Sequence, residues 1–150
     1  MCILVLIYSK LLVWFQGKQI KSFHDDGNDN LLSEIHQKFN YRHGERIKFL
    51  EHVAVTVNIQ CKRRGNIEIF LLSPQNTNVK ILQTRRHDNS TAGFQNWTFM
   101  SVATWSENPQ GKWLLIIRDV NGTDTINRVG KSKLRLYGTR TNPNNLHIKF

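Results

Sequence analysis

Side chains that could take part in nucleophilic catalysis occur along the chain, but they are scattered. Asp25, His52 and Ser101 are the residue types needed as orienting acid, base and nucleophile. Cys61 is a second candidate nucleophile, since a thiolate is activated by a nearby base such as His52 or His87. However, Cys61 ends an alternating apolar run, which favours a structural thiol.

Metal-ligating residues lack the spacing of a known site. The stretch 24–30 is acidic and rich in Asn, but Gly27 comes too early for a calcium loop of the D-x-[DN]-x-[DN]-G type. The six histidines share no ligand spacing, and Cys2 and Cys61 are too few for a zinc cage or a disulfide framework. We therefore predict no metal site and no cofactor site in this chain.

The charge balance is strongly basic. The chain of 150 residues has 21 Lys and Arg against 11 Asp and Glu, a formal charge of +10. Apart from compact clusters at 62–64 and 85–86, these charges are scattered, which favours a solvated basic surface. Nucleic-acid binding would require a basic face with aromatic platforms or a recognition helix, and no such helix is predicted. We therefore expect no nucleic-acid partner.

The first third of the chain differs in character from the rest. Residues 1–15 are apolar except for a break at Lys10, so they fit a signal peptide, a buried strand or the spurious start of an incomplete chain. Residues 17–46 are polar and turn-prone, and we interpret them as a linker. We expect a hydrophobic segment and linker over 1–49, one domain over 50–139, and a tail over 140–150.

From residue 50 onward the apolar pattern has a period of two. Val53, Val55, Val57 and Ile59 alternate with smaller or polar residues, which places them on one face of a strand. Similar short runs follow, separated by turn signals such as the one at 73–76. This pattern predicts an all-β sandwich or barrel. We expect three tryptophans to lie in its core: Trp97, Trp105 and Trp113.

Several short segments of this region occur in a specific order. They are Leu50-Glu51-His52-Val53, Arg63-Arg64-Gly65-Asn66-Ile67-Glu68-Ile69, Leu72-Ser73-Pro74, Arg86-His87-Asp88, Gly93-Phe94-Gln95-Asn96-Trp97-Thr98-Phe99-Met100, Trp105-Ser106-Glu107-Asn108-Pro109, Gly111-Lys112-Trp113 and Leu136-Tyr137-Gly138-Thr139. In order and spacing they resemble the P domain that follows the catalytic domain of kexin- and furin-like proprotein convertases.

The resemblance implies a jelly-roll-like, galactose-binding-like sandwich of about eight strands, preceded by an irregular N-terminal extension. It also implies a partner in the same parent chain, a subtilisin-like catalytic domain that the P domain packs on and stabilises. The parent enzyme would be a calcium-dependent serine endopeptidase that cleaves precursors at paired basic residues in the secretory pathway. Any membrane attachment would come only through that parent.

The resemblance also implies that the catalytic residues lie elsewhere. Subtilisin-like triads lie in recognisable glycine-rich contexts, and Asp25, His52 and Ser101 have none. We therefore expect no catalytic residue in this chain and no activity from it alone.

Strand alternation singles out apolar residues that could contact the catalytic domain. Phe70, Leu72 and Leu82 lie opposite the residues assigned to the core, either as a contact patch or as a second face of the same core.

Three sequons match the N-glycosylation pattern, at Asn89, Asn96 and Asn121. Asn121, in a predicted turn, is the best of them, whereas Asn96 adjoins a tryptophan assigned to the core.

Two departures from the family pattern limit what carries over. Asn66 stands where the family often has Asp, and the stretch after Gly130 is about three residues short, which predicts a shortened final strand with a weaker edge. The alternative function is a stand-alone adhesion or carbohydrate-binding sandwich, since similar jelly rolls serve as lectins.

Overall fold

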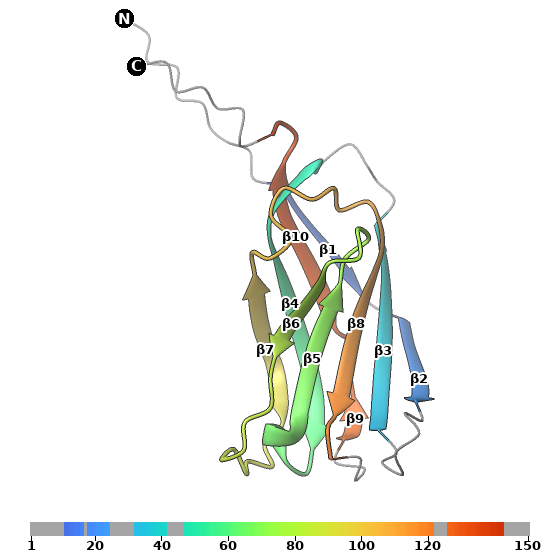
Figure 1. Ribbon diagram of the computed structural model, residues 1–150, viewed down its shortest axis with the longest axis vertical. Helices are drawn as coiled ribbons and strands as arrows, with labels where there is room; N and C mark the ends of the chain where they lie inside the picture. The colour runs from blue at the N-terminus through green and yellow to red at the C-terminus, as the bar shows by residue number, and fades with distance from the viewer. Residues whose placement is uncertain (1–10, 17, 25–31, 42–46, 122–125, 143–150) are drawn as a thin grey trace, which may run out of the picture.

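The computed structural model describes residues 11–16, 18–24, 32–41, 47–121 and 126–142. These residues form two antiparallel sheets of five strands each, packed face to face as a sandwich (Figure 1). The strands are β1 (Leu11–Gln16), β2 (Lys18–His24), β3 (Leu32–Tyr41), β4 (Phe49–Cys61), β5 (Ile67–Leu72), β6 (Asn78–Leu82), β7 (Phe94–Ser101), β8 (Gly111–Asp119), β9 (Ile126–Val129) and β10 (Lys133–Thr139), with a single 3-10 turn, η1 (Arg64–Asn66).

One sheet has the order β1-β10-β4-β7, with β9 also pairing with β4, and the other has the order β2-β3-β8-β5-β6. The predicted all-β sandwich is therefore confirmed. The described residues hold ten strands, more than the expected eight or so, because residues 11–41 add three. No helix in the described ranges could span a membrane.

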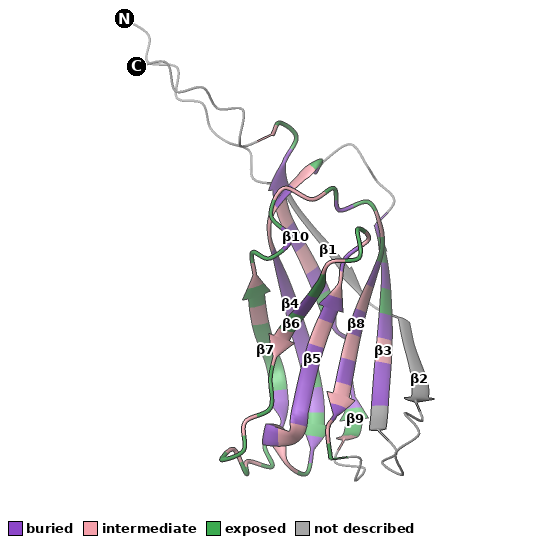
Figure 2. Cartoon of the chain, viewed as in Figure 1, coloured by how far each residue is buried: buried purple, intermediate pink, exposed green. Residues whose placement is uncertain are grey.

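The core follows from the alternation on β4. Val53, Val55, Val57 and Ile59 are all buried and face the second sheet, as the period of two requires. They meet Ile67, Ile69 and Leu71 of β5 and Trp113, Leu115 and Ile117 of β8 in one hydrophobic cluster. Figure 2 shows buried positions along β5 and β8 of that sheet as well. Trp113 is fully buried, and its Nε1–H donates to the carbonyl oxygen of Pro109 at 3.0 Å.

The linker expected over residues 17–46 is wrong. β2 and β3 lie in this stretch, and β3 pairs with β8 from Ser33 opposite Asp119 to Tyr41 opposite Gly111. Its inward residues Ile35, Phe39 and Tyr41 are buried in the core. The strand escapes a search for apolar alternation because the inward position between Ile35 and Phe39 is a glutamine, Gln37.

Gln37 is fully buried, and hydrogen bonds compensate for its polarity. Its Nε2 donates to the carbonyl oxygen of Gly130 at 2.9 Å, and its Oε1 accepts from the backbone N–H of Ser132 at 3.2 Å. The side chain thereby joins β3 to the connection between β9 and β10, across the two sheets.

The weaker final edge expected after Gly130 is also wrong. β10 is seven residues long and lies inside its sheet, paired with β4 on one side and β1 on the other. Of the apolar N-terminal stretch, residues 11–15 belong to β1, which agrees with the strand interpretation, and residues 1–10 lie outside the described ranges.

The expectation that all three tryptophans lie in the core holds for Trp113 alone. Trp97 is 45% exposed and Trp105 is 49% exposed. Trp97 lies on β7, which among the described strands pairs with β4 alone and ends its sheet, so its side chain reaches the margin of the core. Trp105 lies in the turn after β7, where its backbone N–H donates to the carbonyl oxygen of Val102.

Replacing Phe39 with alanine tests whether β3 is an integral strand. We expect Phe39→Ala to lower the free energy of unfolding by about 3–5 kcal/mol, because the side chain is buried and its removal leaves a cavity. The neighbouring exposed Lys38→Ala is the control and should change stability by less than about 0.5 kcal/mol. Urea unfolding of both variants measures the difference, and equal small effects would mean that β3 contributes little.

Candidate functional site

Two loops meet closely at one end of the sandwich. Gly65, in η1, donates its N–H to the carbonyl oxygen of Asp88 at 3.0 Å, and its own carbonyl oxygen accepts from the N–H of Arg85 at 2.9 Å. A Cβ atom at Gly65 would lie 2.2 Å from the carbonyl oxygen of Arg85. Only glycine therefore permits this approach.

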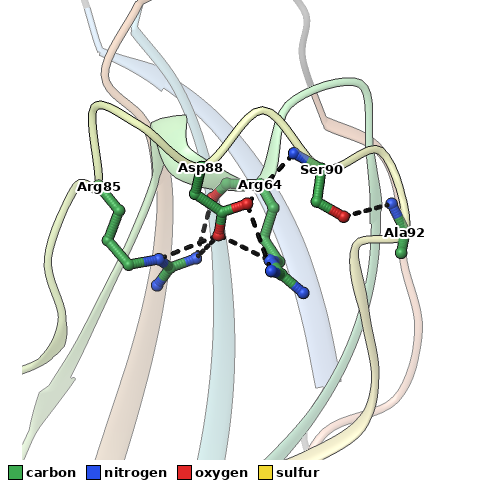
Figure 3. A network of polar contacts seen from close by, with 5 residues as sticks. All are labelled: Arg64, Arg85, Asp88, Ser90 and Ala92. Carbon is green, nitrogen blue, oxygen red and sulfur yellow. Dashed lines mark hydrogen bonds and ion pairs between the residues drawn. The ribbon is translucent and has the colours of Figure 1, made fainter.

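An ion-pair network spans the same two loops (Figure 3). The Oδ2 atom of Asp88 accepts from Nε of Arg64 at 2.8 Å and from a terminal guanidinium nitrogen of Arg85 at 2.9 Å. Its Oδ1 atom accepts from the N–H of Ser90 at 3.2 Å. The hydrogen bond from Arg64, aided by Arg85 and Ser90 against the opposing effect of burial, lowers the pKa of Asp88 to about 2.

The network also contacts aromatic side chains of β7. The guanidinium of Arg64 lies 5.5 Å from the ring centre of Trp97 and 6.0 Å from that of Phe94. Phe94 is buried and meets Trp97 edge-on, while Phe99 stacks on Trp97 with ring centres 6.2 Å apart. These contacts attach the loop network to the edge of the core.

A contiguous apolar patch lies on the outer face of the second sheet, on the strands β5 and β8. Phe70 on β5 lies opposite Ile116 on β8, and Leu72 lies opposite Leu114. All four side chains point away from the buried residues of their strands and are half-buried. We call these four residues the outer patch.

Of the three contact residues suggested by the sequence, the structure brings two together in the outer patch, Phe70 and Leu72. Leu82 is separate, because a register shift between β5 and β6 pairs it with Ile69 and it packs against the core. Alternation places Phe70 and Leu72 correctly on the outer face but cannot reveal the shift at Leu82. A contact of these residues with a catalytic domain stays a prediction. Leu114 and Ile116 of the patch were not singled out, although the unbroken apolar run Trp113–Ile117 is visible in the sequence.

Ion pairs border the outer patch. Lys80 Nζ lies 2.8 Å from a carboxylate oxygen of Glu68, and Arg118 pairs with Glu34. Both cations also lie over the ring of Phe70, at 5.1 Å and 5.3 Å from its centre. Burial of Glu34 opposes its ionisation, but hydrogen bonds from His36 and Arg118 outweigh this effect and lower its pKa. An apolar centre with a charged rim is typical of a protein-binding surface.

The residues considered for catalysis have other roles or lie outside the described part. The ring of His52 stacks on Tyr137 with centres 4.1 Å apart, and Ser101 Oγ accepts from the N–H of Ala103. Burial raises the pKa of the Cys61 thiol, which suits an unreactive side chain. Asp25 lies outside the described ranges, within which no group of three metal-ligating residues occurs.

The three sequon asparagines, Asn89, Asn96 and Asn121, are all exposed. The reason for ranking Asn96 last was wrong, because its neighbour Trp97 is exposed rather than buried. Whether any of them carries a glycan stays a prediction.

Comparisons with known proteins agree with the sandwich fold. Residues 50–136 match the proprotein convertase P-domain family. The chain is 40% identical over 126 residues to furin-like protease 1, isoform 1-CRR, of Drosophila melanogaster, covering 84% of this chain and 11% of that protein. It is 35% identical over 129 residues to the dibasic-processing endoprotease of Schizosaccharomyces pombe, covering 86% of this chain and 18% of that protein.

Among solved structures, the serine protease of Aeromonas sobria in complex with its chaperone aligns with a TM-score of 0.55. That alignment covers 87% of this chain and 28% of the protease chain at 20% identity, so it supports the fold alone. This chain spans 11% of the Drosophila relative and 18% of the Schizosaccharomyces relative, which are therefore much longer proteins.

Removing the Asp88 carboxylate tests the loop network. We expect Asp88→Asn to lower the free energy of unfolding at pH 7 by about 1–3 kcal/mol, because the charged hydrogen bonds to Arg64 and Arg85 are lost. Since the pKa of Asp88 falls from 3.8 to about 2 on folding, its stabilisation is present above about pH 4 and is lost as the pH falls towards 2.

The measurement is urea unfolding of wild type and Asp88→Asn between pH 2 and pH 7, with the exposed neighbour Asn89→Ala as control. The difference between wild type and Asp88→Asn should be constant above about pH 5 and shrink below pH 4. A difference that does not depend on pH would contradict the role of the carboxylate charge.

Proposed function

Because the chain belongs to the proprotein convertase P-domain family, we propose that it packs on a subtilisin-like serine protease domain and stabilises it. The proposal treats the sandwich as one module of a longer parent protein, in keeping with the small share of each relative that it spans. Since such a module binds the native catalytic domain and not its unfolded chain, it would raise the stability of the protease by linkage.

The observation that carries the proposal is the outer patch. In a two-layer sandwich the outward side chains face water and are usually polar, yet Phe70, Leu72, Leu114 and Ile116 form adjacent apolar cross-strand pairs. Such a patch is favourable when a partner covers it, since each Å² of apolar surface removed from water contributes about 25 cal/mol. The bordering pairs Lys80–Glu68 and Arg118–Glu34 would supply a polar rim to the interface.

For the parent protein we propose the activity that its relatives' names describe. One relative is named a dibasic-processing endoprotease and another neuroendocrine convertase 2, which supports cleavage of precursor proteins at paired basic residues. Two relatives are named furin and furin-like protease 1, and we propose that the parent protein acts in the secretory pathway, as the resemblance to furin-like convertases implies. Calcium, where the parent needs it, would be held by the catalytic domain, and this chain would supply the stabilising surface.

The alternative, a stand-alone adhesion or carbohydrate-binding sandwich, rested on fold analogy alone. Membership of the P-domain family over residues 50–136 favours the protease-associated role over it.

Placing a charge in the outer patch tests the proposed contact. Wild-type chain is added to the separately expressed catalytic domain of a furin-like relative, and binding and the melting temperature of that domain are measured. We expect wild type to bind and to raise the melting temperature. We expect Ile116→Asp to bind about 30-fold more weakly, corresponding to the loss of about 2 kcal/mol at a central interface residue.

The matched control is Met100→Asp, which introduces the same charge at an apolar residue that is 68% exposed on β7 of the other sheet. It should bind like wild type. Both variants should first be shown to unfold at the wild-type temperature. A failure of wild type to bind would contradict the function, whereas weaker binding of Met100→Asp alone would move the contact to β7.

A further inference from the structure

A hollow of about 450 Å³ lies beside the loop network, and no part of the proposed function uses it. Three segments form it, and its lining residues are Arg63, Gly65, Asn66, Thr84, Arg86, Val120 and Asn121. Two of these carry guanidinium groups, two carry amides and one carries a hydroxyl, whereas none is acidic. The lining therefore offers hydrogen-bond donors and positive charge together.

Main-chain hydrogen bonds hold the three segments in place. The carbonyl oxygen of Gly65 accepts from the N–H of Arg85, and that of Asn66 accepts from the N–H of Val120 at 3.1 Å. A terminal guanidinium nitrogen of Arg63 donates to the carbonyl oxygen of Arg86 at 2.7 Å, which positions this cation against the opposite loop. The hollow is thus formed before any ligand arrives, so little ordering is required on binding.

The arginines of the two loops differ in whether their charge is compensated. Arg64 and Arg85 share the carboxylate of Asp88, whereas within the described ranges Arg63 and Arg86 have no ion pair. The nearby Asp119 does not line the hollow, and its Oδ1 accepts from the N–H of Asn121. Two arginines without an ion pair among the described residues therefore line the same hollow, where a bound anion would balance their charge.

The Arg63 side chain also has an unused donor. Its Nε atom is shielded from solvent and has no acceptor among the described residues. A buried donor without a partner costs about 1–3 kcal/mol. Because Nε is shielded, a ligand in the hollow would be met by the terminal N–H groups of the Arg63 guanidinium instead.

We propose that this hollow binds an oxyanion, namely a sulfate or phosphate group. The planar guanidinium groups of Arg63 and Arg86 present several N–H donors in the geometry that such oxygens accept. The amides of Asn66 and Asn121 and the hydroxyl of Thr84 complete the donor set. The group arrives either as a free ion or attached to a sulfated sugar chain, and both sources present the same oxygens.

Titration of the purified chain with sodium sulfate or sodium phosphate, against sodium chloride at equal ionic strength, tests the site. We expect saturable binding by calorimetry and a rise in melting temperature with sulfate or phosphate but not with chloride. Asn66→Asp is nearly isosteric and adds one negative charge to the lining, so it should abolish binding. Arg86→Gln should weaken binding at least tenfold.

The control is Lys48→Gln, which removes one positive charge from an exposed side chain outside the hollow and so matches the charge change of Arg86→Gln. It should bind like wild type. Equal responses of wild type and Asn66→Asp would overturn the proposal, because the ion would then bind outside the hollow. Equal weakening by Lys48→Gln and Arg86→Gln would also overturn it, because the effect would then reflect net charge alone.

A sulfated heparin oligosaccharide distinguishes the two sources. If it binds more tightly than inorganic sulfate and Asn66→Asp removes the difference, the natural group is carried on a sugar chain. If it binds no more tightly per sulfate, the natural ligand is a free ion. Oligosaccharide binding that all three variants leave unchanged, together with no binding of inorganic sulfate or phosphate, would contradict the site.

Discussion

The register of β4 is the constraint on which the rest of the sandwich depends. This strand of 13 residues pairs with β10, β7 and β9, so three neighbours take their alignment from it. A slip of one residue would turn Val55 and Val57, both fully buried, out of the core and bring polar side chains such as Thr56 into it. The packing of the two inner faces therefore selects one register, and the outer faces become available for function.

Gly65 fixes how two loops pack at one end of the sandwich. η1 and the turn at 85–88 approach to within hydrogen-bond distance at Gly65. The arginines that flank this contact differ in whether a carboxylate compensates their charge. Arg64 and Arg85 are compensated by Asp88 and contact the aromatic residues of β7. Arg63 and Arg86 line the hollow without a carboxylate, and Asn66, where the family often has Asp, leaves that lining positively charged.

The sequence predicts those parts of the fold in which apolar alternation is unbroken. β4 and β5 follow from it, whereas the family resemblance over residues 50–139 follows from the order and spacing of short segments. β3 does not follow from alternation because Gln37 occupies a core position. Hydrogen bonds to the Gly130 carbonyl and from the Ser132 N–H, about 95 residues later in the chain, offset the cost of burying this side chain. The exposure of Trp97 was missed for another reason: whether a strand is central or at an edge is decided by its neighbours, which local sequence does not specify.

The similarity to a relative also extends beyond the P-domain match at residues 50–136. An alignment of 126 residues with the Drosophila protein cannot fit within residues 50–150, so the similarity reaches into the N-terminal strands.

The strands β5 and β8 are apolar on both of their faces. Their sequences contain nearly continuous apolar runs, Ile69–Leu72 and Trp113–Ile117, a pattern typical of strands covered on both faces. The inner face is covered by the other sheet of the sandwich, while the outer patch is only half-buried. The sequence of these two strands thus fits a sheet with a partner on each side, one of which is the opposite sheet of this chain.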